Sequence, residues 1–318
     1  MKLSNDVLVK RIKTKNKIRR IVTYKSAECE LRKVHNSIFE YLNINFTNSI
    51  FAKAYIKNRS IYSNAKAHMY NDYFIMLDVK DFFNNINHAK LIKRLYFELN
   101  NKANKKSISK LECADIVNKC SVSAKGIPLG FITSPILSNI YLKEFDGILY
   151  GKLKQFKEYN VIYTRYADDL TISFKNTANK EEIKNIIIDI VENLLKHFCL
   201  KLNYKKIRSF DLDISNHVKI TGINIIKDKN NYRQLSVGKK AKNKLFWDAV
   251  ECYKNGIKSY SDIEKIKGMQ SFILSVEKKG FEECYSENMK KIITDAGFKS
   301  LKQLIDSLYY EQDKFKKT

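Results

Sequence analysis

The chain has 318 residues, 44% of them hydrophobic and only 2 of them Pro, which excludes a disordered protein and allows one large or two to three small packed units. It lacks the apolar run of about eighteen residues that a membrane helix needs, so we expect no membrane partner. It also lacks a secretion signal and any C-x-x-C pair, so we expect a cytoplasmic protein with reduced thiols. The 59 Lys and Arg against 34 Asp and Glu give a net charge of +25, which favours nucleic acid as a ligand, although solvated lysines encoded by an AT-rich genome would give the same balance.

The first half of the chain is predicted to begin with helices and to continue with a buried strand. Residues 1 to about 70 are expected to be mainly helical, since Ala27–Asn43 places apolar residues on one helical face. The continuous apolar run Tyr73–Phe83, which ends in acids, predicts a buried strand. Helical segments are expected around Leu91–Leu99 and from there to about Ser123.

The second half is predicted to be mixed and then helical. A Gly/Pro loop runs into a helix at Gly126–Leu149, Val161–Phe174 predicts a strand, a turn and a second strand, and Glu181–Phe198 has helical spacing. HVKITGINII predicts one strand, and KDKNN a turn into the next. From about Gly238 the chain is expected to be helical, with a capping box in SDIE (Ser261–Glu264). This order predicts a three-part α+β protein.

Acidic residues stand at the ends of the predicted strands. Asp78 closes one strand, and Asp168 and Asp169 lie in the tight turn between two others. Three carboxylates that meet there would form a hard oxygen site suited to Mg²⁺, and a pair of such ions can activate a hydroxyl and stabilise a leaving pyrophosphate. An isolated Asp-Asp pair would more often be a solvated hairpin tip. Asp72 and Asp146 are interpreted as ordinary surface acids.

Five short motifs occur in a fixed order: LDVKDFF, GIPLGFITSPILSNIYL, YADD, LKLNYKKIRSF and ITG. This series resembles the palm motifs of reverse transcriptases, and the resemblance runs from about Arg19 to the C-terminus. NAKAH (Asn64–His68), ITG (Ile220–Gly222) and SFILSV (Ser271–Val276) resemble elements of bacterial retron reverse transcriptases in particular.

The resemblance implies an α+β right-hand polymerase with helix-rich fingers, an antiparallel-sheet palm and a helical thumb. Residues 1–77 would form the N-terminal region and fingers, and residues 78–237 the palm, with a helical fingers insertion at about 89–123. Residues 238–318 would form the thumb.

The same resemblance implies the catalytic residues. Asp78, Asp168 and Asp169, with the backbone carbonyl of Val79, would bind two Mg²⁺ ions, or Mn²⁺ in their place. Lys206 would protonate the leaving pyrophosphate, with Lys205 as the rival candidate.

A second group of residues would bind the incoming nucleotide. Phe83 would be the steric gate that excludes a 2′-hydroxyl, with Phe82 on the opposite face. Leu129 departs from the Gln that is usual in the family, so fidelity and substrate discrimination are in question there. Arg19 and Arg20 would grip the triphosphate or contact RNA, and Asp81 would lie near the triphosphate or cap a helix. The remaining members are Pro128 and Gly130, which would shape the loop against the nucleotide.

A third group would contact primer or RNA. Thr221 and Gly222 would lie at the primer grip, and Asn64 and His68 would support either RNA recognition or the junction of fingers and palm. Lysines of the C-terminal helices would grip RNA duplex through its phosphates; they are Lys239, Lys240, Lys242, Lys244, Lys278 and Lys279.

The function implied is that of a bacterial retron reverse transcriptase. It would copy part of a cognate structured non-coding RNA into single-stranded cDNA (msDNA) from dNTPs, starting at a 2′-hydroxyl, and would act with a separate effector protein in antiphage defence. Two alternatives remain: another bacterial reverse transcriptase, of the abortive-infection or diversity-generating type, and a catalytically silent RNA-binding scaffold.

Overall fold

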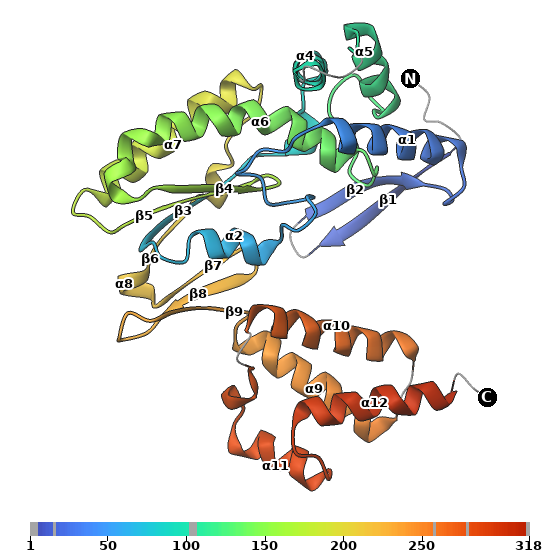
Figure 1. Ribbon diagram of the computed structural model, residues 1–318, viewed down its shortest axis with the longest axis vertical. Coiled ribbons are helices and arrows are strands. Elements are labelled where there is room, and N and C mark those ends of the chain that lie inside the picture. Colours follow the sequence, from blue (N-terminus) through green and yellow to red (C-terminus); the bar gives the residue numbers. More distant parts are fainter. Residues whose placement is uncertain (1–5, 15–16, 102–106, 257–258, 278–279, 316–318) are drawn as a thin grey trace. The chain divides into compact units, whose positions relative to one another are not determined.

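The computed structural model describes residues 6–14, 17–101, 107–256, 259–277 and 280–315. The chain divides into two compact units, Met1–Ser215 and Asn216–Thr318 (Figure 1). The predicted boundaries of fingers, palm and thumb stay predictions. No helix within the described ranges is long and apolar enough to cross a membrane.

The centre of the first unit is a four-stranded antiparallel sheet in the order β4-β5-β3-β6. Its strands are β3 (Tyr73–Asp78), β4 (Ile162–Tyr166), β5 (Asp169–Phe174) and β6 (Arg208–Asp211). Strand β3 is buried because it pairs on both edges and is apolar nearly throughout, as its sequence predicts. The strand–turn–strand prediction for Val161–Phe174 is confirmed as well.

Helices cover this sheet. Figure 1 shows α6 (Ser134–Leu153) and α7 (Lys180–His197) along one face, and α2 (Ile61–Ala67) packs near β4. The apolar side chains of α6 and α7 join those of β3 and β5 in one large core. The other helical segments of this unit are α1 (Glu30–Asn45), α3 (Phe82–Asn85), α4 (His88–Asn100), α5 (Lys110–Lys119), α8 (Leu212–Ser215) and two 3₁₀ segments, Lys154–Tyr159 and Tyr204–Lys206.

The N-terminal segment corrects the prediction of a mainly helical start. Strands β1 (Val7–Thr14) and β2 (Lys17–Tyr24) form an antiparallel hairpin before the first helix. The segment is rich in β-branched residues, which fit a pleated surface. Val22 and Tyr24 of β2 are buried against Phe131, so tertiary packing also stabilises the hairpin.

The second unit combines a three-stranded antiparallel sheet with helices. Its strands are β7 (His217–Ile220), β8 (Ile223–Lys227) and β9 (Arg233–Ser236), followed by α9 (Lys239–Asn255), α10 (Tyr260–Val276), a 3₁₀ turn (Glu282–Cys284), α11 (Glu287–Asp295) and α12 (Leu301–Phe315). The predicted α+β class is therefore confirmed.

Two local predictions in the second unit are wrong. HVKITGINII forms two strands rather than one, because Thr221 (φ 46°) and Gly222 (φ 99°) both adopt the left-handed conformation that a tight hairpin turn needs. The capping box in SDIE is absent, since α10 already begins at Tyr260 with Ser259 as its N-cap. Ser261 therefore lies inside the helix.

Candidate active site

Strand pairing brings the three predicted catalytic acids together. Asp78, the last residue of β3, lies opposite Asp169, the first residue of β5. Asp168 precedes it in the β4–β5 turn, and its carbonyl oxygen accepts a hydrogen bond of 3.0 Å from the backbone N–H of Val79. The turn is tight because Ala167 adopts a left-handed conformation (φ 57°). The carboxylates thus lie side by side at one end of the central sheet.

Asp78 is almost completely buried and is held by two side chains that follow α7 in the sequence. Asn203 Nδ2 donates to Asp78 Oδ1 at 2.7 Å, and Lys206 Nζ lies 2.6 Å from Asp78 Oδ2. This hydrogen bond raises the pKa of Lys206, and the charges of Asp78, Asp168 and Asp169 add to the effect. Of the two predicted lysines, Lys206 is therefore the one that contacts the acids. Asn203 was not predicted as a site residue, although it lies within the motif LKLNYKKIRSF.

Asp169 shows the electrostatic cost of this arrangement. The residue keeps accessible surface, but surrounding protein partly removes water from its carboxyl group. This desolvation, with repulsion from Asp168 and Asp78, raises the pKa of Asp169 from 3.8 to about 6, against the opposing charge of Lys206. A cation placed between the carboxylates would relieve that repulsion.

The chemistry of these residues fits a divalent cation, although the site is not preformed. Carboxylate oxygens are the ligands that Mg²⁺ and Mn²⁺ favour. Within the described part of the chain, however, no three acidic, His or Cys side chains already form a metal-binding group. Both carboxylate oxygens of Asp78 are instead bound by side chains, Oδ1 by Asn203 and Oδ2 by Lys206. An ion that used Asp78 would replace the ammonium group of Lys206. Val79 is buried directly beside Asp78 and lines the same cleft.

A cleft of about 950 Å³ opens beside the acids. Its walls include Asp78, Asp168, Asn203 and Lys206 from the central sheet and the chain that follows it. The other lining residues are Arg20, Val22, Tyr55, Val79, Lys80, Asp81, Phe82, Phe83, Asn84, Val122, Ser123, Lys125, Gly126, Ile127, Pro128 and Leu129. The structure therefore brings two of the predicted acids, Asp78 and Asp168, and most of the predicted nucleotide-binding residues to one cleft, while Asp169 pairs with Asp78 beside it.

The Gly/Pro loop forms one wall because it lies against strand β2. The N–H of Val22 donates to the carbonyl oxygen of Leu129 at 2.8 Å. A Cβ atom on Gly130 (φ 110°) would lie 2.4 Å from the Val22 carbonyl oxygen, so only glycine permits this approach. The contact carries β2 to the cleft and places Arg20 on its wall. The side chain of Arg19 lies outside the described residues.

Other residues of the loop have structural partners. The carbonyl oxygen of Pro128 accepts a bond of 2.7 Å from Ser134 Oγ at the start of α6. Leu129 is half-buried and packs against the main core, so its side chain has an apolar role where the family usually has Gln.

The predicted steric gate lies on a single helical turn. Phe82 and Phe83 both belong to α3 and both line the cleft, with ring centroids 5.2 Å apart. The prediction that they face opposite ways is wrong, because strand alternation does not apply to a helix. Asp81 precedes them in a left-handed conformation (φ 47°), exposed at the cleft and without a capping hydrogen bond from its side chain.

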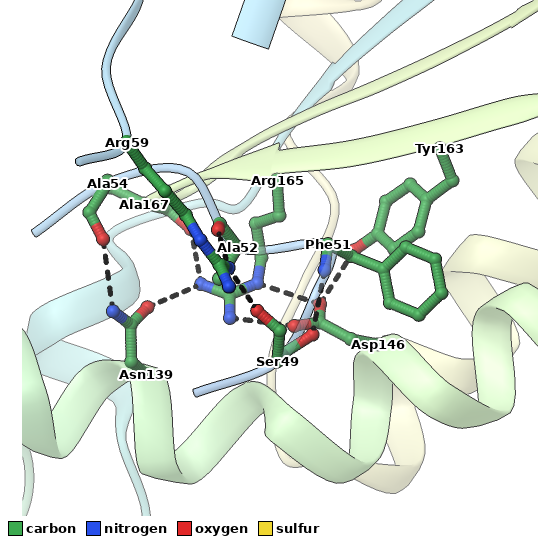
Figure 2. A network of polar contacts seen from close by, with 10 residues as sticks. All are labelled: Ser49, Phe51, Ala52, Ala54, Arg59, Asn139, Asp146, Tyr163, Arg165 and Ala167. Carbon is green, nitrogen blue, oxygen red and sulfur yellow. Dashed lines mark hydrogen bonds and ion pairs between the residues drawn. The ribbon is translucent and has the colours of Figure 1, made fainter. Parts of the chain in front are cut away.

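A buried ion pair between Arg165 and Asp146 lies beside the catalytic turn, and Arg165 also donates to the carbonyl oxygen of Ala167 in that turn (Figure 2). Arg165 and Asp146 are both fully buried and are joined by two hydrogen bonds of 2.8 Å, and Tyr163 donates to the same carboxylate. The interpretation of Asp146 as a surface acid is therefore wrong, and Asp72, which is 9% exposed, is also largely buried. The signal for Asp146 was available: an Arg within an apolar strand requires a buried acid.

Asn64 and His68 lie in the interior of the first unit. The two ring nitrogens of His68 are 2.7 Å from Ser173 Oγ on β5 and Thr164 Oγ1 on β4. Burial, with the nearby charge of Lys53, lowers the pKa of His68 to about 3, so the ring is neutral. Because neither Asn64 nor His68 reaches the surface, the structure favours the structural alternative over a direct RNA contact.

The remaining predicted residues belong to the second unit. Thr221 and Gly222 form the β7–β8 turn, and Lys239 and Lys240 are exposed in the first turn of α9. Their roles toward RNA or primer stay predictions. Lys242 is instead buried in an ion pair of 2.8 Å with Glu277. Lys244 forms an ion pair with Asp248, and Lys278 and Lys279 lie outside the described residues.

The fold is shared with solved reverse-transcriptase structures. A telomerase from Candida albicans, solved with the TWJ fragment of telomeric RNA, has a TM-score of 0.50 at 12% identity; the match covers 96% of this chain and 60% of that one. A telomerase from Candida tropicalis gives 0.50 at 13% identity, with 71% and 48% covered. At these identities the likeness concerns the fold alone.

Relatives found by sequence indicate the family more specifically than these solved structures do. The Retron Ec73 reverse transcriptase of Escherichia coli is 30% identical over 198 residues, which are 57% of this chain and 60% of that protein. The Retron Ec83 reverse transcriptase of the same species is 28% identical over 257 residues, 79% of this chain and 76% of that protein. These relatives confirm the resemblance to the retron type. A family model described as reverse transcriptase (RNA-dependent DNA polymerase) matches residues 10–225, and the chain therefore belongs to the reverse transcriptase family.

Proposed function

We propose that the chain is an RNA-directed DNA polymerase whose active site is the cleft at the end of the central sheet. The observation that carries this proposal is the pairing of Asp78 with Asp169, beside Asp168, in a member of the reverse transcriptase family. Mutually repelling acids at strand ends carry no evident benefit for stability, whereas nucleotidyl transfer requires charge of this kind.

The acids and Lys206 have distinct parts in this mechanism. Asp78, Asp168 and Asp169 would hold two divalent ions, which we propose to be Mg²⁺. Bound ions would supply Lewis-acid activation of the attacking hydroxyl and stabilisation of the leaving pyrophosphate. Lys206 Nζ keeps its proton, since its pKa is raised, and it lies at the wall of the cleft. From this place it would donate that proton to the leaving pyrophosphate.

The cleft walls would select and orient the dNTP. Arg20 is exposed on one wall and offers a guanidinium to the triphosphate. Phe83 is held in place by its burial, and the N–H of Ile127 donates to its carbonyl oxygen at 2.9 Å. A ring fixed in this way would exclude the 2′-hydroxyl of a ribonucleotide.

We further propose a retron role, supported by the retron relatives and by the net charge of +25. The enzyme would copy part of a cognate structured non-coding RNA into msDNA in the bacterial cytoplasm, starting from the 2′-hydroxyl of an internal guanosine. A separate effector protein would act with it in antiphage defence.

The activity is tested with the purified protein on a primed RNA template with dNTPs and Mg²⁺. Asp168→Asn should lower incorporation about a thousandfold, because several kcal/mol of metal-dependent stabilisation are lost and each ~1.4 kcal/mol is a factor of ten. Asp295→Asn, at the exposed end of α11, is the matched control and should change nothing. Unchanged incorporation by Asp168→Asn would refute the assignment.

The retron role needs a separate readout. Nucleic acid that co-purifies with the protein from its own host should contain RNA joined to DNA through a 2′–5′ branch. Sequencing that yields only unlinked or protein-primed cDNA would favour the abortive-infection or diversity-generating type. RNA without any cDNA, together with no incorporation by the unmodified protein, would favour the silent scaffold.

A further inference from the structure

The segment before α2 is attached to strand β4 through Arg165. The backbone N–H of Arg165 donates to the carbonyl oxygen of Phe51 at 2.9 Å, and its own carbonyl oxygen accepts from the N–H of Lys53 at 2.7 Å. Ala52, between them, is fully buried and bridges to Arg165. The segment therefore runs beside the strand that leads into the catalytic turn.

Side chains fix the same segment from two further directions (Figure 2). Arg59 Nη1 donates to the carbonyl oxygens of Ser49 at 2.5 Å and Ala52 at 2.6 Å. Asn139 Nδ2, on α6, donates to the carbonyl oxygen of Ala54 at 3.1 Å. Ser49 and the stretch from Phe51 to Ala54 are thus held by specific backbone contacts.

The guanidinium of Arg165 joins this segment to the catalytic turn. Its Nη1 donates to Asn139 Oδ1 at 3.1 Å and to the carbonyl oxygen of Ala167 at 3.3 Å, while Asp146 binds the other nitrogens. Ala167 directly precedes Asp168, and Ala54 directly precedes Tyr55. The buried guanidinium thus contacts the residue before the acid directly, and it is linked through Asn139 to the residue before the tyrosine.

Tyr55 is exposed, although Ala54 directly before it is buried. It lines the same cleft as Asp168, with 54% of its surface accessible. Its backbone is left-handed (φ 62°), a conformation that is costly for an aromatic residue and persists only where the surroundings impose it. A ring that served only to fill the core would need neither the exposure nor the strain.

The hydroxyl of Tyr55 remains a hydrogen-bond donor. Desolvation raises its pKa, and the charges of Asp168, Tyr166 and Asp169 raise it further. The side chain thus offers the cleft an aromatic face and a protonated hydroxyl close to the acids. Aromatic faces of this kind stack on nucleotides without requiring a particular base.

We propose that Tyr55 is a substrate-contacting residue, whose ring packs on the nucleotide unit nearest Asp168 and whose position is set by the buried Arg165 network. The inference rests on the proposed polymerase function. The nucleotide unit has two sources, the incoming dNTP and the terminus of the primer strand, which share a sugar and a base.

The test compares Tyr55→Asn, Tyr55→Phe and the control Tyr70→Asn. Asn tolerates a left-handed backbone, so Tyr55→Asn removes the ring without adding strain. Tyr70 is also exposed, at 66%, but is not among the residues that line the cleft. Melting temperatures should agree among all four proteins within the error of a thermal scan.

Tyr55→Asn should raise one KM about tenfold, as the loss of one stacking contact predicts. A rise in the KM for dNTP identifies the incoming nucleotide, and a rise in the KM for primer–template identifies the strand terminus. Tyr55→Phe should keep most of the affinity, because the ring remains. Equilibrium binding of labelled dATP and of a labelled RNA–DNA primer–template gives the same comparison without catalysis.

Equal affinity of Tyr55→Asn and the unmodified protein for both ligands would overturn the inference. That outcome leaves the polymerase proposal intact if the unmodified protein still incorporates dNTPs. Conversely, weakened binding by Tyr55→Asn supports the contact even if incorporation fails. The two proposals therefore fail separately.

Discussion

Replacing Asp146 with Asn would leave the guanidinium of Arg165 charged and buried without its counter-ion. Both side chains have 0% exposure, and two bonds of 2.8 Å join them. Asn keeps one acceptor oxygen but no charge. Removing one partner of such a buried pair costs about 3–5 kcal/mol. For a unit the size of Met1–Ser215, each kcal/mol lowers the melting temperature by about 2–4 °C, so Asp146→Asn should lower it by roughly 6–20 °C.

Thermal unfolding followed by circular dichroism measures this change, and the chain offers a matched control. Asp115 and Lys119 form an ion pair of 2.6 Å on α5, but both are more than half exposed. Because water screens such a pair, Asp115→Asn should cost less than about 1 kcal/mol. A melting temperature for Asp146→Asn within about 2 °C of the unmodified protein would refute the reasoning. The double change Asp146→Leu with Arg165→Met should be milder than Asp146→Asn, since no isolated charge remains.

Two further predictions concern the cleft. The pKa of Asp169 in the folded protein is about 6, above its ordinary value of 3.8. Between these two pH values the carboxyl group is protonated in the folded chain but ionised in the unfolded chain. Its ionised form, which Asp168 and Asp78 repel, therefore destabilises the folded protein fully only above pH 6. Without divalent ions, Asp169→Asn should therefore melt at a higher temperature than the unmodified protein at pH 8, with the difference gone by pH 4; a difference that grows as the pH falls would contradict this. Phe83→Ala should raise the ratio of kcat/KM for ribonucleotides over deoxyribonucleotides about tenfold or more, measured by primer extension. The control Tyr70→Ala, at an exposed residue that is not among those lining the cleft, should leave the ratio unchanged. An unchanged ratio for Phe83→Ala would remove Phe83 as the gate.

Local patterns predicted the central sheet and the position of the acids. Tyr73–Leu77 is apolar without interruption, which fits a strand such as β3 that is paired on both edges and buried, so the sequence alone indicates this burial. Asp78 and Asp169 stand at strand ends, so their meeting follows once the strands pair as neighbours. The cleft's main acids could thus be predicted from the sequence.

What the sequence did not reveal depends on partners far along the chain. Arg165 in an apolar strand indicates that some acid is buried with it, but only the fold identifies that acid as Asp146. The hairpin before α1 is basic and short, and its strand conformation depends partly on packing against Phe131. Tyr55 becomes informative only when its left-handed backbone and its place in the cleft are known.

His68 has a consequence that reaches from the interior of the sheet to the acids. Its two bonds, to Thr164 on β4 and Ser173 on β5, fit only one alignment of these strands. A shift by a single residue would turn every side chain of β5 to the other face and move a different residue into the place of Asp169. With a pKa of about 3, the ring stays uncharged across the range in which Asp169 titrates. His68 therefore keeps the two strands in register, and with them the acids, at every pH at which Asp169 gains or loses its proton.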